Sequence, residues 1–132
     1  MELYKIGGNE LADPAFLAGL GQIIASRTDP VIIVHGGGKV ITELQTQFNL
    51  PTHKVDGLRV TNAESMRLTE MAMSGHANKI IVAALQAAGV DAIGLSGVDG
   101  GLLRCHKRQH PTADLGYVGK IDHVRTELLH QL

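Results

Sequence analysis

The chain has 132 residues, a length that fits one domain with a single core. Its apolar fraction of 44% and charged fraction of 19% are those of a globular protein and exclude disorder. A formal net charge of −1 argues against a nucleic-acid partner or a membrane surface, because both need a concentrated basic field. The sequence shows no leader and no long apolar run, so we expect a cytoplasmic protein whose only cysteine, Cys105, is buried or half-buried.

Predicted strands and helices alternate through the first third of the chain. An apolar strand at residues 3–6 ends in two glycines, and Asp13, followed by proline, is typical of a helix start. The β-branched run 31–34 predicts a parallel strand that is buried on both faces. It leads through the triple glycine 36–38 into a helix over residues 40–48. This order of elements is typical of an α/β fold.

A hairpin and a long helix follow. The Asp56-Gly57 pair between two β-prone triplets predicts the turn of the hairpin. Asn62 is placed to cap a helix that extends to about residue 88. The remaining predicted elements are a third core strand at 92–95, short strands at 102–107 and 117–121, and a helix at 124–132.

Glycine loops follow the first two predicted strands, at what should be one edge of the sheet. Backbone N–H groups and helix N-termini at such an edge favour a carboxylate or a phosphate. The triple glycine is not a P-loop, because Lys39 is followed by Val40 instead of serine or threonine. No histidine spacing predicts a metal site, and no serine nucleophile motif is present.

Two cationic residues are candidates for this anion site. Lys5 lies near the end of an apolar strand, where its ammonium group either faces water at an edge or is aimed at a phosphoryl group. Arg59 follows the hairpin turn, where it is either a solvated arginine or a bidentate partner for a carboxylate. We expect His35, at the end of the second strand, to be a hydrogen-bonded structural residue.

Several motifs occur in an order that resembles acetylglutamate kinases of the amino-acid kinase family. They are Lys5-Ile6-Gly7-Gly8, VIIVHGGG at 31–38, DGLRVT at 56–61, Asn78-Lys79, GLSGVDG at 94–100 and GYVG at 116–119. The resemblance extends over essentially the whole chain. It implies a three-layer αβα sandwich with a mainly parallel central sheet, and ATP-dependent phosphorylation of the side-chain carboxylate of N-acetyl-L-glutamate in arginine biosynthesis.

The resemblance also implies roles for particular residues. Lys5 would contact the transferring phosphoryl group. Gly8, Gly37 and Gly38 would donate backbone N–H groups around the reacting carboxylate and the phosphoryl oxygens. Arg59 would pair with the α-carboxylate of the substrate. This division of labour suits phosphoryl transfer, which depends mostly on positioning and electrostatic stabilisation.

In that family the N-terminal lobe binds the amino-acid substrate, and the C-terminal lobe binds ATP and Mg²⁺. The resemblance therefore implies that residues 1–132 form the substrate lobe, without the ATP lobe, and that this fragment alone is inactive. It also implies a homodimer through the long helix from Asn62. Two rival functions stay open: an aminoadipate-type kinase of lysine biosynthesis, and a non-catalytic module that binds an acidic amino acid.

Overall fold

The computed structural model describes residues 1–132. Its strands are β1 (Glu2–Ile6), β2 (Val31–His35), β3 (His53–Val55), β4 (Leu58–Val60), β5 (Leu103–Lys107) and β6 (Gly119–Val124). Its helices are α1 (Pro14–Ala25), α2 (Gly38–Gln47), α3 (Ala63–Glu70), α4 (Asn78–Ala87) and α5 (Thr126–Gln131). Two short 3₁₀ turns, η1 (Glu10–Ala12) and η3 (Asp99–Gly101), and a π-helical segment, η2 (Met71–Ala77), complete the order. None of the helices combines the length and apolar character that crossing a membrane requires.

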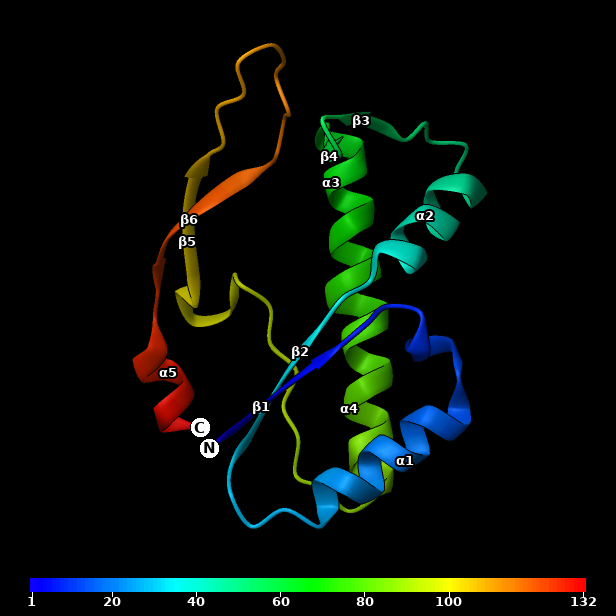
Figure 1. Cartoon of the computed structure of the whole chain (residues 1–132), viewed down its shortest axis with the longest axis vertical. Coiled ribbons are helices and arrows are strands. Elements are labelled where there is room, and N and C mark those ends of the chain that lie inside the picture. The colour runs from blue at the N-terminus through cyan, green and yellow to red at the C-terminus, as the bar shows by residue number, and fades with distance from the viewer.

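The strands form three pairs. β1 and β2 are parallel, with Leu3 opposite Ile32, whereas β3–β4 and β5–β6 are antiparallel. Figure 1 shows β1 and β2 crossing in front of the column formed by α3, η2 and α4, with α1 beside the lower part of that column. The β5–β6 hairpin and α5 form a separate arm on the left of the view. The expected α/β class with a parallel sheet is confirmed.

The hydrophobic core lies on one face of the β1–β2 sheet. Alternate residues of the strands, such as Tyr4 and Ile33, point toward α1 and α4, which pack against each other. The buried apolar cluster consists of Ile6, Leu11, Leu20, Ile24, Ala77, Ile81 and Leu85. On the opposite face Leu3 is 70% exposed and Val34 is 47% exposed. The expectation that the second strand is buried on both faces is therefore wrong for this chain.

Local sequence signals produce the predicted caps and the predicted turn. The side chain of Asp13 accepts a hydrogen bond from Ala15 N at 2.9 Å, and this cap opens α1. Asn62 Oδ1 accepts from Ser65 N at 2.8 Å and opens α3. In the hairpin turn Asp56 has φ of 49° and Gly57 has φ of 78°, the left-handed pair that a two-residue hairpin needs.

The long helix is continuous but not uniform. The α-helical pitch of α3 gives way to the π-helical segment η2 and returns in α4. Gly75 lies inside η2, and a Cβ there would meet no atom of another segment within 4 Å, so no close contact requires glycine at this position. Gly89, with φ of 81°, follows the last turn, so the helix ends about where the sequence predicts.

Three expectations need correction. Residues 92–95 form no strand, and the carbonyl groups of Gly94 and Leu95 accept from side chains of α4 instead of from a neighbouring strand. Phe48, predicted as the last residue of the helix 40–48, is the C-cap of α2 and is 58% exposed. Cys105 is exposed because all of β5 is exposed, although its residue type favours burial.

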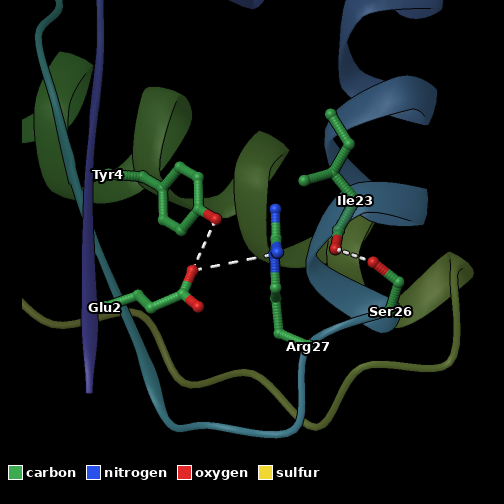
Figure 2. Close-up of polar contacts among 5 residues, drawn as sticks. All are labelled: Glu2, Tyr4, Ile23, Ser26 and Arg27. Carbon is green, nitrogen blue, oxygen red and sulfur yellow. Dashed lines mark hydrogen bonds and ion pairs between the residues drawn. The ribbon is translucent and has the colours of Figure 1, made fainter.

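A polar cluster occupies the amino end of the parallel sheet (Figure 2). The Tyr4 hydroxyl donates to Glu2 Oε2 at 2.6 Å, and Arg27 Nε lies 3.6 Å from the same oxygen. Close by, Ser26 Oγ donates to the Ile23 carbonyl at 2.7 Å. The hydrogen bond to Glu2 raises the pKa of Tyr4 above its ordinary value. These side chains therefore satisfy one another where β1 and β2 begin.

Candidate active site

Two glycine loops meet where β1 and β2 end. Gly36 N donates to the Ile6 carbonyl at 2.9 Å, which continues the parallel ladder into the loops. A Cβ on Gly8 would lie 3.0 Å from both Cα and N of Gly37. A Cβ on Gly37 would in turn overlap the sulfur of Met73, which belongs to η2. Side chains are thus excluded here, and backbone N–H groups can approach a ligand directly.

Lys5 places its ammonium group beside these loops. Its Nζ donates to the Ile6 carbonyl at 3.1 Å and lies 3.8 Å from the position that a Cβ on Gly36 would take. The residue is exposed and forms no ion pair with a carboxylate of the chain. Of its two predicted environments, water at an edge and an anionic partner, the chain itself supplies only the first. The ammonium group keeps donors for an incoming anion.

The helix α2 begins in the second glycine loop. Gly37 is its N-cap, and no side chain accepts a hydrogen bond from the first turn. The backbone N–H groups of that turn, starting at Gly38, therefore have no partner from a capping side chain. Together with the helix dipole they make the start of α2 favourable for negative charge.

Arg59 reaches α2 from strand β4. Its Nη1 donates to Gln45 Oε1 and, at 3.4 Å, to Thr52 Oγ1. Its Nη2 donates at 3.3 Å to Thr42 Oγ1, which itself donates to the Gly38 carbonyl at 2.9 Å. Arg59 is thus linked to the glycine loop through one hydroxyl group. The structure brings Lys5, Gly8, Gly37 and Gly38 together where the two strands end, and it places Arg59 against α2, one helical turn after Gly38.

A second polar group lies between the loops and α4. The amide nitrogen of Asn78, a buried residue, lies 3.4 Å from His35 Nε2 and donates to the Leu95 carbonyl at 3.3 Å. Lys79 Nζ donates to Asn78 Oδ1 at 2.9 Å and to the Gly94 carbonyl at 3.2 Å. His35 is hydrogen-bonded, as predicted for a structural residue. These contacts fix the segment that follows α4 against the end of β2.

Asp99, in the GLSGVDG motif, is held as a carboxylate. It accepts hydrogen bonds from Ser96 N at 2.6 Å and from Ser96 Oγ at 2.7 Å. These bonds, with a smaller contribution from the charge of Lys79, lower the pKa of Asp99 below its ordinary value. No group of three or more His, Cys, Asp or Glu side chains is arranged to hold a metal ion.

Sequence reasoning missed the side chains that hold Arg59. Gln45 is only 1% exposed, and it lies one helical turn after the buried Ile41 on the inner side of α2. A polar residue in an apolar helical stripe was the available signal, because buried amides need hydrogen-bond partners. Thr42 and Thr52 carry no such signal, since threonine is common on exposed helices and loops.

The fold and this edge together define an α/β domain that can receive a small anion where two parallel strands end. The chain belongs to the amino acid kinase family, whose family model matches residues 2–132.

Curated relatives at high identity are acetylglutamate kinases. The chain is 51% identical over 120 residues to the acetylglutamate kinase of Chloroflexus aggregans, covering 91% of the chain and 47% of that relative. It is 46% identical over 128 residues to the acetylglutamate kinase of Roseiflexus castenholzii, covering 97% of the chain and 49% of the relative. The chain therefore spans about half the length of the curated relatives that it matches.

Solved structures share the fold. The crystal structure of smu.665 from Streptococcus mutans UA159 matches with a TM-score of 0.78 and 28% identity, over 98% of this chain and 53% of that one. N-acetylglutamate synthase from Neisseria gonorrhoeae, complexed with coenzyme A and L-arginine, matches with a TM-score of 0.69 and 20% identity, over 98% of this chain and 32% of that one. The second likeness concerns the fold alone.

Proposed function

We propose that this chain binds N-acetyl-L-glutamate as the substrate lobe of an acetylglutamate kinase of arginine biosynthesis. Membership of the amino acid kinase family and identities of 45–51% to acetylglutamate kinases support the proposal. The observation that carries it is the joining of Arg59 to the glycine loop through Thr42. A dicarboxylate can then bridge the guanidinium group and the backbone N–H groups of the loops.

The proposed reaction needs no group of the protein to become covalently modified. An oxygen of the substrate's side-chain carboxylate attacks the γ-phosphorus of ATP, and the bond from that phosphorus to the bridging oxygen of ADP breaks. The products are an acyl phosphate and ADP. The chain's part is to orient the attacking carboxylate and to offset negative charge as it develops.

Each predicted residue has a place in this mechanism. Arg59 pairs with the α-carboxylate and so fixes which carboxylate of the substrate faces the loops. Gly8, Gly37 and Gly38 donate backbone N–H groups to the reacting carboxylate and to the phosphoryl oxygens. Lys5 neutralises charge on the transferring group, because its ammonium lies beside the loops.

ATP and Mg²⁺ are proposed to bind mainly outside residues 1–132. The glycine loops and Lys5 suit one phosphoryl group, but no acidic cluster of the chain suits Mg²⁺. We therefore infer that these residues alone bind N-acetyl-L-glutamate without turning ATP over. ATP-dependent formation of the acyl phosphate by this chain alone would contradict that inference.

A homodimer through the long helix is also proposed. Phe48 is 58% exposed and Met71 is 59% exposed, and both line a shallow apolar groove between α2 and α3. A second copy of the chain would cover this groove. Sedimentation velocity should show a dimer for the wild type and a monomer for Met71→Glu, because the new carboxylate would be desolvated at the contact. A monomeric wild-type chain would contradict the proposal.

Calorimetric titration of the chain with N-acetyl-L-glutamate tests the binding function. Wild-type binding should be saturable, and Arg59→Ala should weaken it by about 100-fold or more, the loss typical of an unpaired charged group. Arg27→Ala, which removes an arginine at the other end of the sheet, is the matched control and should bind like wild type. Tighter binding of an L-2-aminoadipate derivative would indicate the lysine-pathway substrate instead.

A further inference from the structure

The guanidinium group of Arg59 is held by acceptors on only one of its edges. Nη1 donates to two acceptors within the chain, Gln45 Oε1 and Thr52 Oγ1. Nη2 uses one hydrogen for Thr42, and neither its second hydrogen nor the N–H of Nε has a partner in the chain. A carboxylate can bind a guanidinium end-on, through Nη1 and Nη2, or side-on, through Nε and Nη2. Only the side-on edge contains a nitrogen, Nε, whose N–H has no partner at all in the chain.

Gln45 determines this choice more than any other residue. Its side chain is buried, and its amide oxygen accepts from Arg59 Nη1 and also, at 2.9 Å, from Thr52 Oγ1. Thr52 closes a three-membered ring of hydrogen bonds, because its hydroxyl accepts from Nη1 and donates to Gln45. A buried amide that satisfies a cation in this way is costly to disturb.

We propose that Gln45 is a positioning residue for substrate binding: it fixes Nη1 of Arg59 and leaves the Nε–Nη2 edge to receive the α-carboxylate side-on. The inference rests on the proposed function, in which Arg59 pairs with that carboxylate. Pre-ordering the arginine lowers the entropy lost on binding, because the side chain is already in its bound rotamer. The same hydrogen bond from Nη1 to Gln45 also sets the direction from which the carboxylate approaches Arg59. That direction determines which end of the substrate reaches the glycine loops.

Gln45→Met is the variant that tests this role. Methionine keeps the length and approximate volume of the buried side chain but removes the acceptor. The affinity of the chain for N-acetyl-L-glutamate, measured by calorimetry, should fall about tenfold, the value of one charged hydrogen bond. Gln47→Met, an exposed glutamine on the same helix, is the matched control and should bind like wild type.

Two further measurements separate positioning from a merely structural effect. In an Arg59→Ala background, Gln45→Met should cause no further loss of affinity, because there is no guanidinium group left to position. For the α-amide of N-acetyl-L-glutamate, which lacks the charged α-carboxylate, wild type and Gln45→Met should differ by less than about twofold. Equal losses in both backgrounds, or for both ligands, would overturn the inference.

Side-chain ¹⁵N NMR spectra of the wild-type chain test whether the guanidinium group of Arg59 is fixed, and they need no variant. Without ligand, Arg59 should show separate Nη1 and Nη2 resonances, as expected for a guanidinium that cannot rotate. Free rotation would overturn the inference. Absence of wild-type binding would overturn the proposed function and this inference with it, whereas wild-type binding that survives Gln45→Met would overturn the inference alone.

Discussion

The two ends of the parallel sheet carry polar side chains for opposite reasons. Where β1 and β2 begin, the Tyr4 hydroxyl and Arg27 converge on the Glu2 carboxylate, so these charged and polar groups find partners within the chain (Figure 2). Where the strands end, Lys5 has no anionic partner, and beyond the first turn of α2 the N–H of Arg59 Nε has no acceptor in the chain. The first end is internally satisfied, and the second is open to a ligand.

This difference shows that residues at one end of the sheet contribute to folding stability, whereas residues at the other end are placed to bind a ligand. Polar groups that pair with one another add modestly to the folded state, since most of their hydrogen bonds replace bonds to water. Donors that are held in place but left unpaired add nothing to stability, yet they are already arranged for an anion. Substitutions at the two ends should therefore divide between effects on unfolding and effects on binding.

Among the glycine substitutions, the largest effect on both binding and stability is expected for Gly8→Ala. The new Cβ would lie 3.0 Å from the backbone of Gly37 and would force the two glycine loops apart. Binding of N-acetyl-L-glutamate should fall by about 100-fold, because a shift of about 1 Å in a positioning group is enough for such a loss. The free energy of unfolding should fall by about 1–3 kcal/mol through overpacking. Calorimetric titration and urea unfolding measure the two quantities.

Gly19→Ala is the control for this change. Gly19 lies within α1, and a Cβ there would meet no atom within 4 Å. Alanine should therefore stabilise the chain by about 0.5–1 kcal/mol through helix propensity and leave binding unchanged. Wild-type affinity in Gly8→Ala, or a similar loss in both variants, would show that the contact between the loops does not organise the site.

A smaller effect is expected at the amino end for Arg27→Ala. Arg27 and Glu2 form a partly exposed ion pair at 3.6 Å. Its removal should lower the free energy of unfolding by no more than about 1 kcal/mol, as measured by urea unfolding. Affinity for N-acetyl-L-glutamate should stay within about twofold of wild type, since additivity holds for distant sites. A large loss of affinity would mean that the two ends are coupled.

The smallest effect concerns the pH dependence of stability at Tyr4. Its hydrogen bond to Glu2 raises the pKa of Tyr4 in the folded chain. The folded state therefore holds this proton more tightly than the unfolded state. The contribution to stability is complete below the unfolded pKa and is lost as pH rises through the higher folded pKa.

Thermal unfolding of wild type and Tyr4→Phe between about pH 8 and pH 11 measures this contribution. The difference in Tm between the two proteins should shrink toward the alkaline end of the range. The rest of the chain is the same in both proteins, so its contribution cancels in the comparison. A difference in Tm that does not change with pH would contradict the assigned role of the hydrogen bond.

Much of the fold could be predicted because its signals are local. Asp13 and Asn62 cap their helices, and Asp56-Gly57 makes the hairpin turn, through contacts within a few residues. Residues 92–95 form no strand, although their apolar composition predicts one, because composition does not reveal that the side chains of Asn78 and Lys79 bind the carbonyls of Leu95 and Gly94.

The candidate site likewise has one part that the sequence predicts and one part that it does not. Lys5 and the glycine loops lie at the ends of predicted strands, so topology alone brings them together. Gln45 and Thr52 hold Arg59 through contacts between α2, a loop and β4, and no local pattern records those contacts. The order of the motifs predicts that the site lies where the parallel strands end. Only the packing of α2 against β4 shows that Gln45 and Thr52 orient Arg59.

The most direct test is a ¹H–¹⁵N NMR titration of the chain with N-acetyl-L-glutamate. The largest amide shifts should fall at Gly8, Gly37 and Gly38, with a change in the Arg59 side-chain resonances, while Ser26 and Arg27 stay unmoved. Saturable binding with shifts centred on Ser26 and Arg27, or with none at the glycine loops, would contradict the assignment of the carboxyl end of the sheet as the substrate site.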